Sequence, residues 1–296
     1  MKTQTLVSIG LPVHNGGELL RQAVDSLLGQ DYSNLELVIS DNASTDNTRA
    51  ICEESCARDT RVRYYRNPIN IGAPSNFNKV FGYTTGEYFI WAGHDDHRKP
   101  NYISVCVKAL EKSDKIVLAG TYCDCVDVQG NLILVDESMS TVGMDAFHRF
   151  MRYKRSLHEY SRHRGGIVYG VYRRSALQKV MPMQNAMTAD QNMMLELSLI
   201  GEFDTVPERL LTRRMGGPSN SNNSLKNLAS SYGITNPFLI YGAYITREYA
   251  IDGILANSKL GIPQKAQLMV WSLFHTFTAV SARVLSLFWY RIRGAQ

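Results

Sequence analysis

The sequence predicts an α/β fold in which crossover helices join the strands of a sheet. From residue 6 onward, short runs rich in β-forming residues alternate with segments of helical spacing, and turn residues separate them. The 296 residues are 44% hydrophobic, so the chain can bury the core of one large domain, or of one domain with an appendage. This composition argues against disorder.

The first third of the chain carries four predicted strands, at residues 6–11, 35–40, 62–65 and 88–92. Between the first two, apolar residues recur at helical spacing from Leu19 to Leu28. Ser44-Thr45-Asp46 supplies N-cap chemistry for a second helix through Cys52, and a third is expected around residues 77–81. This alternation is the basis of the predicted fold class.

Further along, the pattern predicts a helix at residues 102–110, a strand at 116–122, a hairpin turn at 129–131 and a strand at 166–172. Another helix begins near Asp190. Residues 216–224 are rich in Gly, Ser and Asn, which marks the end of the compact unit. We therefore expect a domain over residues 1–222 and a helical extension over 223–296.

An amphipathic helix is predicted in that extension, at about residues 264–291. Seventeen residues from Ala266 precede Arg283, fewer than the roughly twenty that a membrane span needs. The wide aromatic face suits either peripheral contact with the inner face of the cell membrane, or packing against its own domain or a partner in a homodimer. Because Leu6 to Leu11 is too short for a signal peptide, a cytoplasmic location is expected.

The formal charge of +5 favours anionic partners, which include phosphate groups, acidic membranes and nucleic acid. Nucleic-acid binding is disfavoured, because the basic stretch at residues 149–164 has no recognition motif; a solvated face, or contact with an anionic acceptor or lipid, explains it more simply. Five cysteines are an odd number, which argues against a disulfide framework. Buried small hydrophobic residues are a better interpretation than a zinc site at Cys52, Cys56, Cys123 and Cys125.

The first predicted strand-to-helix turn, at residues 11–17, argues against two common cofactor classes. It lacks the glycine spacing of a dinucleotide-binding fingerprint and the lysine of a phosphate-binding loop, which disfavours nicotinamide and ATP enzymes. Backbone amides near the start of the following helix can still contact a nucleotide, although an ordinary turn is an equally simple interpretation.

Asp95 and Asp96 are the central candidate residues. They follow the predicted strand at 88–92, and ligands of open α/β sheets bind at the carboxyl ends of strands. Carboxylate oxygens are the ligands that Mg²⁺ and Mn²⁺ prefer. Two adjacent acidic residues are otherwise an ordinary solvated turn. The flanking His94 and His97 are weaker candidates for contact with an ion or substrate.

The spacing of several motifs resembles that of family 2 glycosyltransferases of GT-A fold. The matching segments are residues 7–15, 30–32, 37–46, 67–72 and 86–91, followed by Asp95-Asp96. The resemblance spans roughly residues 5 to 220 and does not cover the remaining C-terminal part. It implies a GT-A type mixed, mostly parallel sheet flanked by helices, here with a C-terminal helical extension.

By this resemblance, Asp96 binds the metal, Mn²⁺ or Mg²⁺, and Asp95 binds the ribose or a metal-bound water. Asp41 is implied to accept the imide N–H of a uracil ring, while the alternative for this residue is a helix-capping role. The residues implied in nucleotide-sugar binding are Pro12, Val13, Asn15, Asp41, Asn70, Asp95, Arg213 and Arg214.

Asp190 matches the position of the family's general base, which takes the proton of the acceptor hydroxyl. The family commonly has Glu directly before it, where this chain has Ala189. Met215 also stands where many members have His, so we expect Arg213 or Arg214 to contact the diphosphate instead. The alternative for Asp190 is an acidic residue favoured by the helix dipole.

The resemblance thus implies a metal-dependent, inverting glycosyltransferase of hexosyltransferase type. We expect a nucleotide-diphosphate donor, with UDP favoured, and a saccharide or lipid-linked saccharide acceptor in surface polysaccharide synthesis. A noncatalytic subunit that binds a nucleotide sugar or carbohydrate is the alternative. Nucleotidyl transfer is disfavoured, because its glycine-rich, lysine-containing loop is absent. The sugar and the linkage depend on loop shapes that spacing does not encode.

Overall fold

The computed structural model describes residues 4–157, 165–183, 189–215 and 261–266. The chain divides into two compact units, residues 1–235 and 236–296. In the second unit, residues 262–266 are helical. The predicted boundary at residue 222, and the predicted amphipathic helix beyond residue 266, lie outside the described residues and stay predictions. No helix in the described part is long and apolar enough to cross a membrane.

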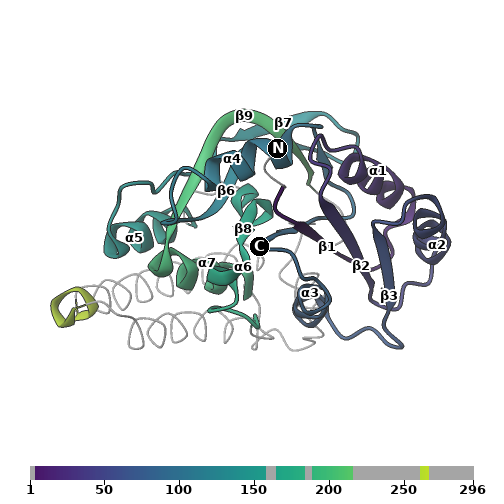
Figure 1. Ribbon diagram of the computed structural model, residues 1–296, viewed down its shortest axis with the longest axis horizontal. Helices are drawn as coiled ribbons and strands as arrows, with labels where there is room; N and C mark the ends of the chain where they lie inside the picture. Colours follow the sequence, from purple (N-terminus) through teal and green to yellow (C-terminus); the bar gives the residue numbers. More distant parts are fainter. Residues whose placement is uncertain (1–3, 158–164, 184–188, 216–260, 267–296) are drawn as a thin grey trace, which may run out of the picture. The chain divides into compact units, whose positions relative to one another are not determined.

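The first unit is built on a nine-stranded sheet with helices packed against it (Figure 1). The strands are β1 (Val7–Val13), β2 (Leu35–Asp41), β3 (Val62–Arg66), β4 (Tyr88–Trp91), β5 (His97–Arg98), β6 (Ile116–Val126), β7 (Leu132–Asp136), β8 (Val171–Arg173) and β9 (Glu202–Arg214). The helices are α1 (Gly17–Leu28), α2 (Thr48–Arg58), α3 (Ala73–Gly82), α4 (Tyr102–Leu110), α5 (Ala146–Ser156), α6 (Arg174–Leu177), α7 (Ala189–Ile200) and the 3-10 helix η1 (Gly166–Tyr169).

The strand order is β3-β2-β1-β4-β8-β6-β9-β5, and β7 pairs with β6. Strands β3, β2, β1 and β4 are parallel, whereas β8 runs antiparallel to both β4 and β6. The chain adds β2 and β3 on one side of β1, and β4 on the other. This reversal beside β1 is the position at which open α/β sheets bind ligands. The predicted α/β class, with a mixed and mostly parallel sheet, is confirmed.

Side chains of β1 point alternately to the two faces of the sheet, and helices cover both faces. Val7, Ile9 and Leu11 belong to the same buried cluster as the apolar residues of α1, α2 and α4. Gly10 points the other way, where an added Cβ would lie 3.1 Å from Val80 of α3. Figure 1 shows α1 and α2 on one side of the strands and α3 on the other. The core therefore holds the strand ends rigidly in register.

Most predicted elements lie within a few residues of the observed ones, but the strand expected at residues 166–172 is largely wrong. Residues Gly166–Tyr169 form a 3-10 helix, and only Val171–Arg173 pair as a strand. Gly165 adopts a left-handed φ of 75°, which turns the chain into the helix. The apolar residues of this segment are buried by that helical turn rather than by strand alternation.

The basic stretch at residues 149–164 is only partly a solvated face, so that expectation needs correction. Arg149 is buried in α5, and its guanidinium donates to the carbonyls of Ser198 and Leu199 at the C-terminal end of α7. Cations are favoured there because they satisfy the terminal carbonyls and complement the helix dipole. Lys154 is also buried. Residues 158–164 lie outside the described part.

Candidate active site

The carboxyl ends of the parallel strands gather the predicted donor-binding residues at one edge of the sheet. Val13 at the end of β1 is in register with Asp41 of β2, which is in turn in register with Arg66 of β3. The end of β4 lies beside β1, with Trp91 opposite Gly10, and the chain then runs into residues 93–96. Segments far apart in the sequence thus meet at the position expected of a ligand site.

Asp41 is the anchor of this edge. Its side chain is fully buried, with Oδ1 accepting the N–H of Ser44 at 2.8 Å. Its Oδ2 accepts the hydroxyl of Tyr64 at 2.8 Å and Nη1 of Arg66 at 2.5 Å. Burial opposes ionisation, but these hydrogen bonds hold the pKa of Asp41 below its ordinary value.

In this structure Asp41 therefore holds Ser44, Tyr64 and Arg66 in place through hydrogen bonds. Because the carboxylate is inaccessible, a uracil N–H can reach it only after one of these donors moves; the base-reading role stays a prediction. The alternative of a helix cap is not what is observed. Helix α2 begins at Thr48, and Oδ1 of Asp46 accepts the Thr48 N–H at 3.0 Å.

The turn after β1 is held by side chains of the loop after β2. The N–H groups of Asn15, Gly16 and Gly17 donate to Ser44 Oγ, Thr48 Oγ1 and Asp46 Oδ2, at 2.9, 2.8 and 3.0 Å. These amides are thus hydrogen-bonded within the protein, and their contact with a nucleotide stays a prediction. Pro12 and Val13 are buried within β1. Their placement at the sheet edge sets the direction of this turn.

Asn70 belongs to a network of asparagines that shapes the loop between β3 and α3. Its Oδ1 accepts from Nδ2 of Asn42 at 2.7 Å and from the N–H of Gly72 at 2.9 Å. The buried Asn67 donates to Asn42 Oδ1 at 3.1 Å and to Asn76 Oδ1 at 3.0 Å. Asn70 itself is exposed, so this loop presents it at the surface from a fixed backbone.

The Asp95-Asp96 turn brings two carboxylates together. A Cβ placed on Gly93 would lie 2.6 Å from Oδ2 of Asp96 and 3.3 Å from Oδ1 of Asp95, so both side chains fold back over this glycine. Glycine at position 93 leaves the space in which these oxygens converge. Two hard oxygen donors, with substrate phosphates and water to complete the shell, fit a Mg²⁺ or Mn²⁺ ion.

No group of three or more His, Cys, Asp or Glu side chains disposed to hold a metal occurs in the described residues. A site completed by substrate oxygens is consistent with this finding. His94 is half-buried, and its charge lowers the pKa of Asp96 slightly against the larger effect of burial. His97 is exposed on β5. All five cysteines are free, and four of them are buried.

Asp96 is 5% exposed and lies beside the buried Arg213. Burial raises the pKa of its carboxyl group; Arg213 opposes this increase, and Asp95 adds to it. Nε of Arg213 lies 4.0 Å from Oδ2 of Asp96, which is the range of an ion pair. The guanidinium of Arg98 is also buried nearby and donates to the carbonyls of Trp91 and Tyr169, at 2.9 and 3.2 Å.

The two predicted arginines separate because side chains alternate along β9. Arg213 points to Asp96, and its guanidinium carbon lies 4.5 Å from the centre of the Tyr169 ring. Nη1 of Arg214 donates instead to the carbonyls of Asp127 and Val128, in the hairpin between β6 and β7. Only Arg213 is thus beside the paired carboxylates.

Asp190 lies in the first turn of α7, where the helix dipole favours a carboxylate. Its side chain is exposed. Burial raises the pKa of Tyr169 to about 12; Arg213 opposes this increase, while Asp96, Asp190 and Asp95 add to it. The charges of all three carboxylates therefore act on the Tyr169 hydroxyl.

Sequence reasoning missed four residues of this site: Tyr64, Arg66, Arg98 and Tyr169. Tyr64 lies in the strand predicted at residues 62–65 and Arg66 directly follows it; this placement could have found both, because ends of neighbouring parallel strands share one edge. Arg98 lies two residues beyond Asp96 and faces the same buried region. No pattern in the sequence indicated Tyr169, which reaches the site through the unpredicted 3-10 helix.

Comparison with solved structures supports the fold. S. aureus TarS, residues 1–349, determined in complex with UDP-GlcNAc, superposes with a TM-score of 0.66 and 15% identity over 93% of this chain and 73% of that chain. Mannosyltransferase PcManGT from Pyrobaculum calidifontis, determined with GDP-Man and Mn²⁺, gives a TM-score of 0.52 at 15% identity, covering 95% of this chain and 85% of that one. At this identity the likeness shows the fold alone.

Relatives found by sequence have higher identity to this chain, but the matching segments cover less of it. An uncharacterised glycosyltransferase of Haemophilus influenzae is 32% identical over 126 residues, which cover 43% of this chain and 39% of the relative. WcaA of Escherichia coli (strain K12), named for colanic acid biosynthesis, is 31% identical over 157 residues, covering 53% of this chain and 56% of the relative. The chain thus spans about half or less of the length of these relatives. The model of glycosyl transferase family 2 matches residues 8–181, more than half of the sequence, and the chain therefore belongs to that family.

Proposed function

We propose that this family 2 glycosyltransferase moves a hexose from a nucleotide-diphosphate donor to a hydroxyl group of a saccharide or lipid-linked saccharide. The observation that carries the proposal is the Asp95-Asp96 turn, whose carboxylates fold over Gly93 with the buried Arg213 4.0 Å from Asp96. The exposed Asp190 at the start of α7 supports a separate base. Paired oxygen donors, a cation and a separate accessible carboxylate are the groups that transfer from a diphosphate requires.

In the proposed reaction, Asp190 takes the proton of the acceptor hydroxyl while its oxygen attacks the anomeric carbon. The bond from that carbon to the diphosphate oxygen breaks, the electron pair leaves with the nucleoside diphosphate, and the anomeric configuration inverts. Arg213 stabilises negative charge on the diphosphate. Asp96 would hold a Mn²⁺ or Mg²⁺ ion, with Asp95 beside it, and such an ion neutralises charge on the leaving group.

The donor is proposed to be a UDP-sugar, and Mn²⁺ the ion. UDP-GlcNAc bound to the structural neighbour TarS supports the base, and Mn²⁺ bound to PcManGT supports the metal. The name of the E. coli relative supports a role in polysaccharide synthesis. PcManGT, in contrast, was determined with GDP-Man, so an experiment is needed to identify the nucleotide base of the donor. Thermal shift with UDP, GDP and dTDP sugars, each with Mn²⁺ or with a chelator, makes that choice, since a ligand that binds only the folded state raises Tm.

The central test measures donor hydrolysis and transfer with Mn²⁺ for wild type, Asp96→Ala and Asp190→Ala. We expect Asp190→Ala to lower transfer by about 10²- to 10⁴-fold, the usual contribution of a general base, with UDP binding retained. Asp96→Ala should lose the Mn²⁺-dependent part of UDP binding. The matched control is Asp114→Ala, because that side chain is fully exposed.

Full transfer activity in either site variant would contradict the assignment of that residue. Tight donor binding by the wild type without transfer to any acceptor would instead favour a noncatalytic nucleotide-sugar-binding subunit. Circular dichroism spectra that match the wild type establish that each variant is folded, so that a loss of activity reports the site.

A further inference from the structure

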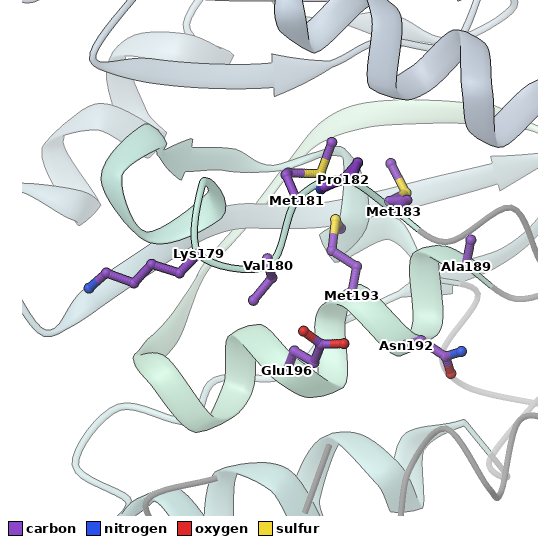
Figure 2. Close-up of a pocket in the computed structure, with 9 residues that line it drawn as sticks. All are labelled: Lys179, Val180, Met181, Pro182, Met183, Ala189, Asn192, Met193 and Glu196. Atoms are coloured by element: carbon purple, nitrogen blue, oxygen red, sulfur yellow. The ribbon is translucent and has the colours of Figure 1, made fainter. Parts of the chain in front are cut away.

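A cavity of about 220 Å³ opens between α7 and the loop that follows α6 (Figure 2). Its walls are loop residues 179–183 and four residues of the helix, Ala189, Asn192, Met193 and Glu196. We call it the Glu196 cavity. It is smaller than the roughly 300 to 1,000 Å³ of sites that enclose a whole small molecule, so it suits one ring of a larger ligand.

Glu196 gives the cavity its chemical character. Figure 2 shows its carboxylate turned from α7 toward the loop. The side chain is half-buried, and burial raises its pKa. Within the described part of the chain, no hydrogen bond or ion pair to this carboxylate is found, and the Lys179 side chain extends away from it (Figure 2). A sheltered carboxyl group without a partner destabilises a fold, which makes it a candidate for ligand contact.

The remaining walls are mainly apolar. Met193 extends from the helix toward the loop, where Met181 and Pro182 form the opposite wall (Figure 2). Asn192 is 3% exposed and its Oδ1 is buried, so it forms part of the wall and leaves Glu196 as the acceptor. Apolar side chains can cover the C–H face of a sugar ring, while the carboxylate oxygens accept its hydroxyl hydrogens.

The position of the cavity on α7 relates it to the acceptor. Ala189, Asn192, Met193 and Glu196 recur at intervals of three and four residues, and so share one face of the helix. Asp190 directly follows Ala189 at the N-terminal end of that helix. Glu196 lies six residues further, a rise of about 9 Å at 1.5 Å per residue. The cavity thus begins at the end of α7 that carries the proposed base, on the neighbouring face of the helix.

We infer that the Glu196 cavity holds a sugar ring of a saccharide acceptor, with Glu196 accepting a hydrogen bond from a ring hydroxyl. This inference rests on the proposed function, because it assigns the acceptor that Asp190 deprotonates. The ring in the cavity is one that lies beyond the reacting hydroxyl, so the cavity selects for acceptors longer than a monosaccharide.

The test uses the full chain with UDP and Mn²⁺, and saturation-transfer NMR with disaccharides of glucose, galactose, mannose and N-acetylglucosamine as probes. The variants are Glu196→Ala and Glu196→Gln, with Glu137→Ala as the matched control because Glu137 is an exposed glutamate. We expect at least one disaccharide to bind wild type and the control equally. Glu196→Ala should weaken it at least about tenfold, the loss of one charge-assisted hydrogen bond. Glu196→Gln keeps the shape and should leave Tm unchanged or raised.

Two results would overturn the inference: no disaccharide of the panel binds the wild type, or Glu196→Ala binds as tightly as the control. Calorimetry of UDP with Mn²⁺ on the same samples separates this failure from that of the proposed function. If UDP binding is intact while Glu196→Ala binds the disaccharide as tightly as the control, only the cavity assignment fails. If the wild type does not bind a nucleotide diphosphate, the proposed function fails.

Discussion

Replacing Asp41 with asparagine tests whether the buried carboxylate anchors the sheet edge. The asparagine side chain would keep one oxygen for the Ser44 N–H, but its amide group would replace the oxygen that accepts from Tyr64 and Arg66. Hydrogen bonds to a charged group contribute about 1.5 to 3 kcal/mol each. Because the Arg66 side chain is 35% exposed and can turn to water, we expect a total loss of about 2 to 4 kcal/mol.

The matched control is Asp25→Asn. Arg58 Nη2 lies 2.5 Å from Asp25 Oδ1, the same separation as in the Arg66–Asp41 pair, but these side chains are 49% and 51% exposed. Exposed pairs contribute about 0 to 1 kcal/mol. Urea unfolding followed by circular dichroism gives both free energies, and equal m values show that the same transition is compared. Equal losses in the two variants would refute the argument that burial decides the strength of the Asp41 contacts.

The same substitution predicts a pH dependence. The pKa of Asp41 in the folded protein lies below its ordinary value of 3.8, so its stabilisation is complete above that value and is lost as pH falls through the folded pKa. The gap in unfolding free energy between wild type and Asp41→Asn should be constant near neutral pH and shrink in acid. A gap that widens on acidification would contradict the sign of this shift.

Two further pairs of variants test the site and the packing. Arg213→Met should weaken UDP binding with Mn²⁺ at least about tenfold by calorimetry, while Arg214→Met, which removes contacts to the hairpin, should change it less than about twofold; equal effects would contradict the separation of the two arginines. Gly201→Ala should lower stability by about 1 to 3 kcal/mol in urea unfolding, because the new Cβ would lie 2.3 Å from Val117 Cγ1. Gly82→Ala, whose Cβ would meet no atom of another described segment within 4 Å, should raise stability by up to about 1 kcal/mol, and a loss there would show that the space is not open.

Local patterns in the sequence determined the elements that bury one regular face. The helix expected at residues 102–110 is observed as Tyr102–Leu110, and the strand expected at 35–40 is observed as Leu35–Asp41. Both depend on periodic apolar residues that lie next to one another in the folded chain. The order of these elements was enough to predict the α/β class, and Asp41, Asp95 and Asp96 after strand ends indicated the edge of the sheet that carries the candidate site.

Long-range packing decided what local patterns could not. Alternation predicts that Arg213 and Arg214 face opposite ways, but only the sheet order shows that Arg213 meets Asp96, while Arg214 meets the hairpin. Tyr169 reaches the site because Gly165 turns the chain into a 3-10 helix. Oδ2 of Asp41 accepts from Tyr64 and Arg66 of a strand about 25 residues away, because β2 pairs with β3. Sequence spacing encodes which residues share a face, whereas pairing of distant strands decides which faces meet.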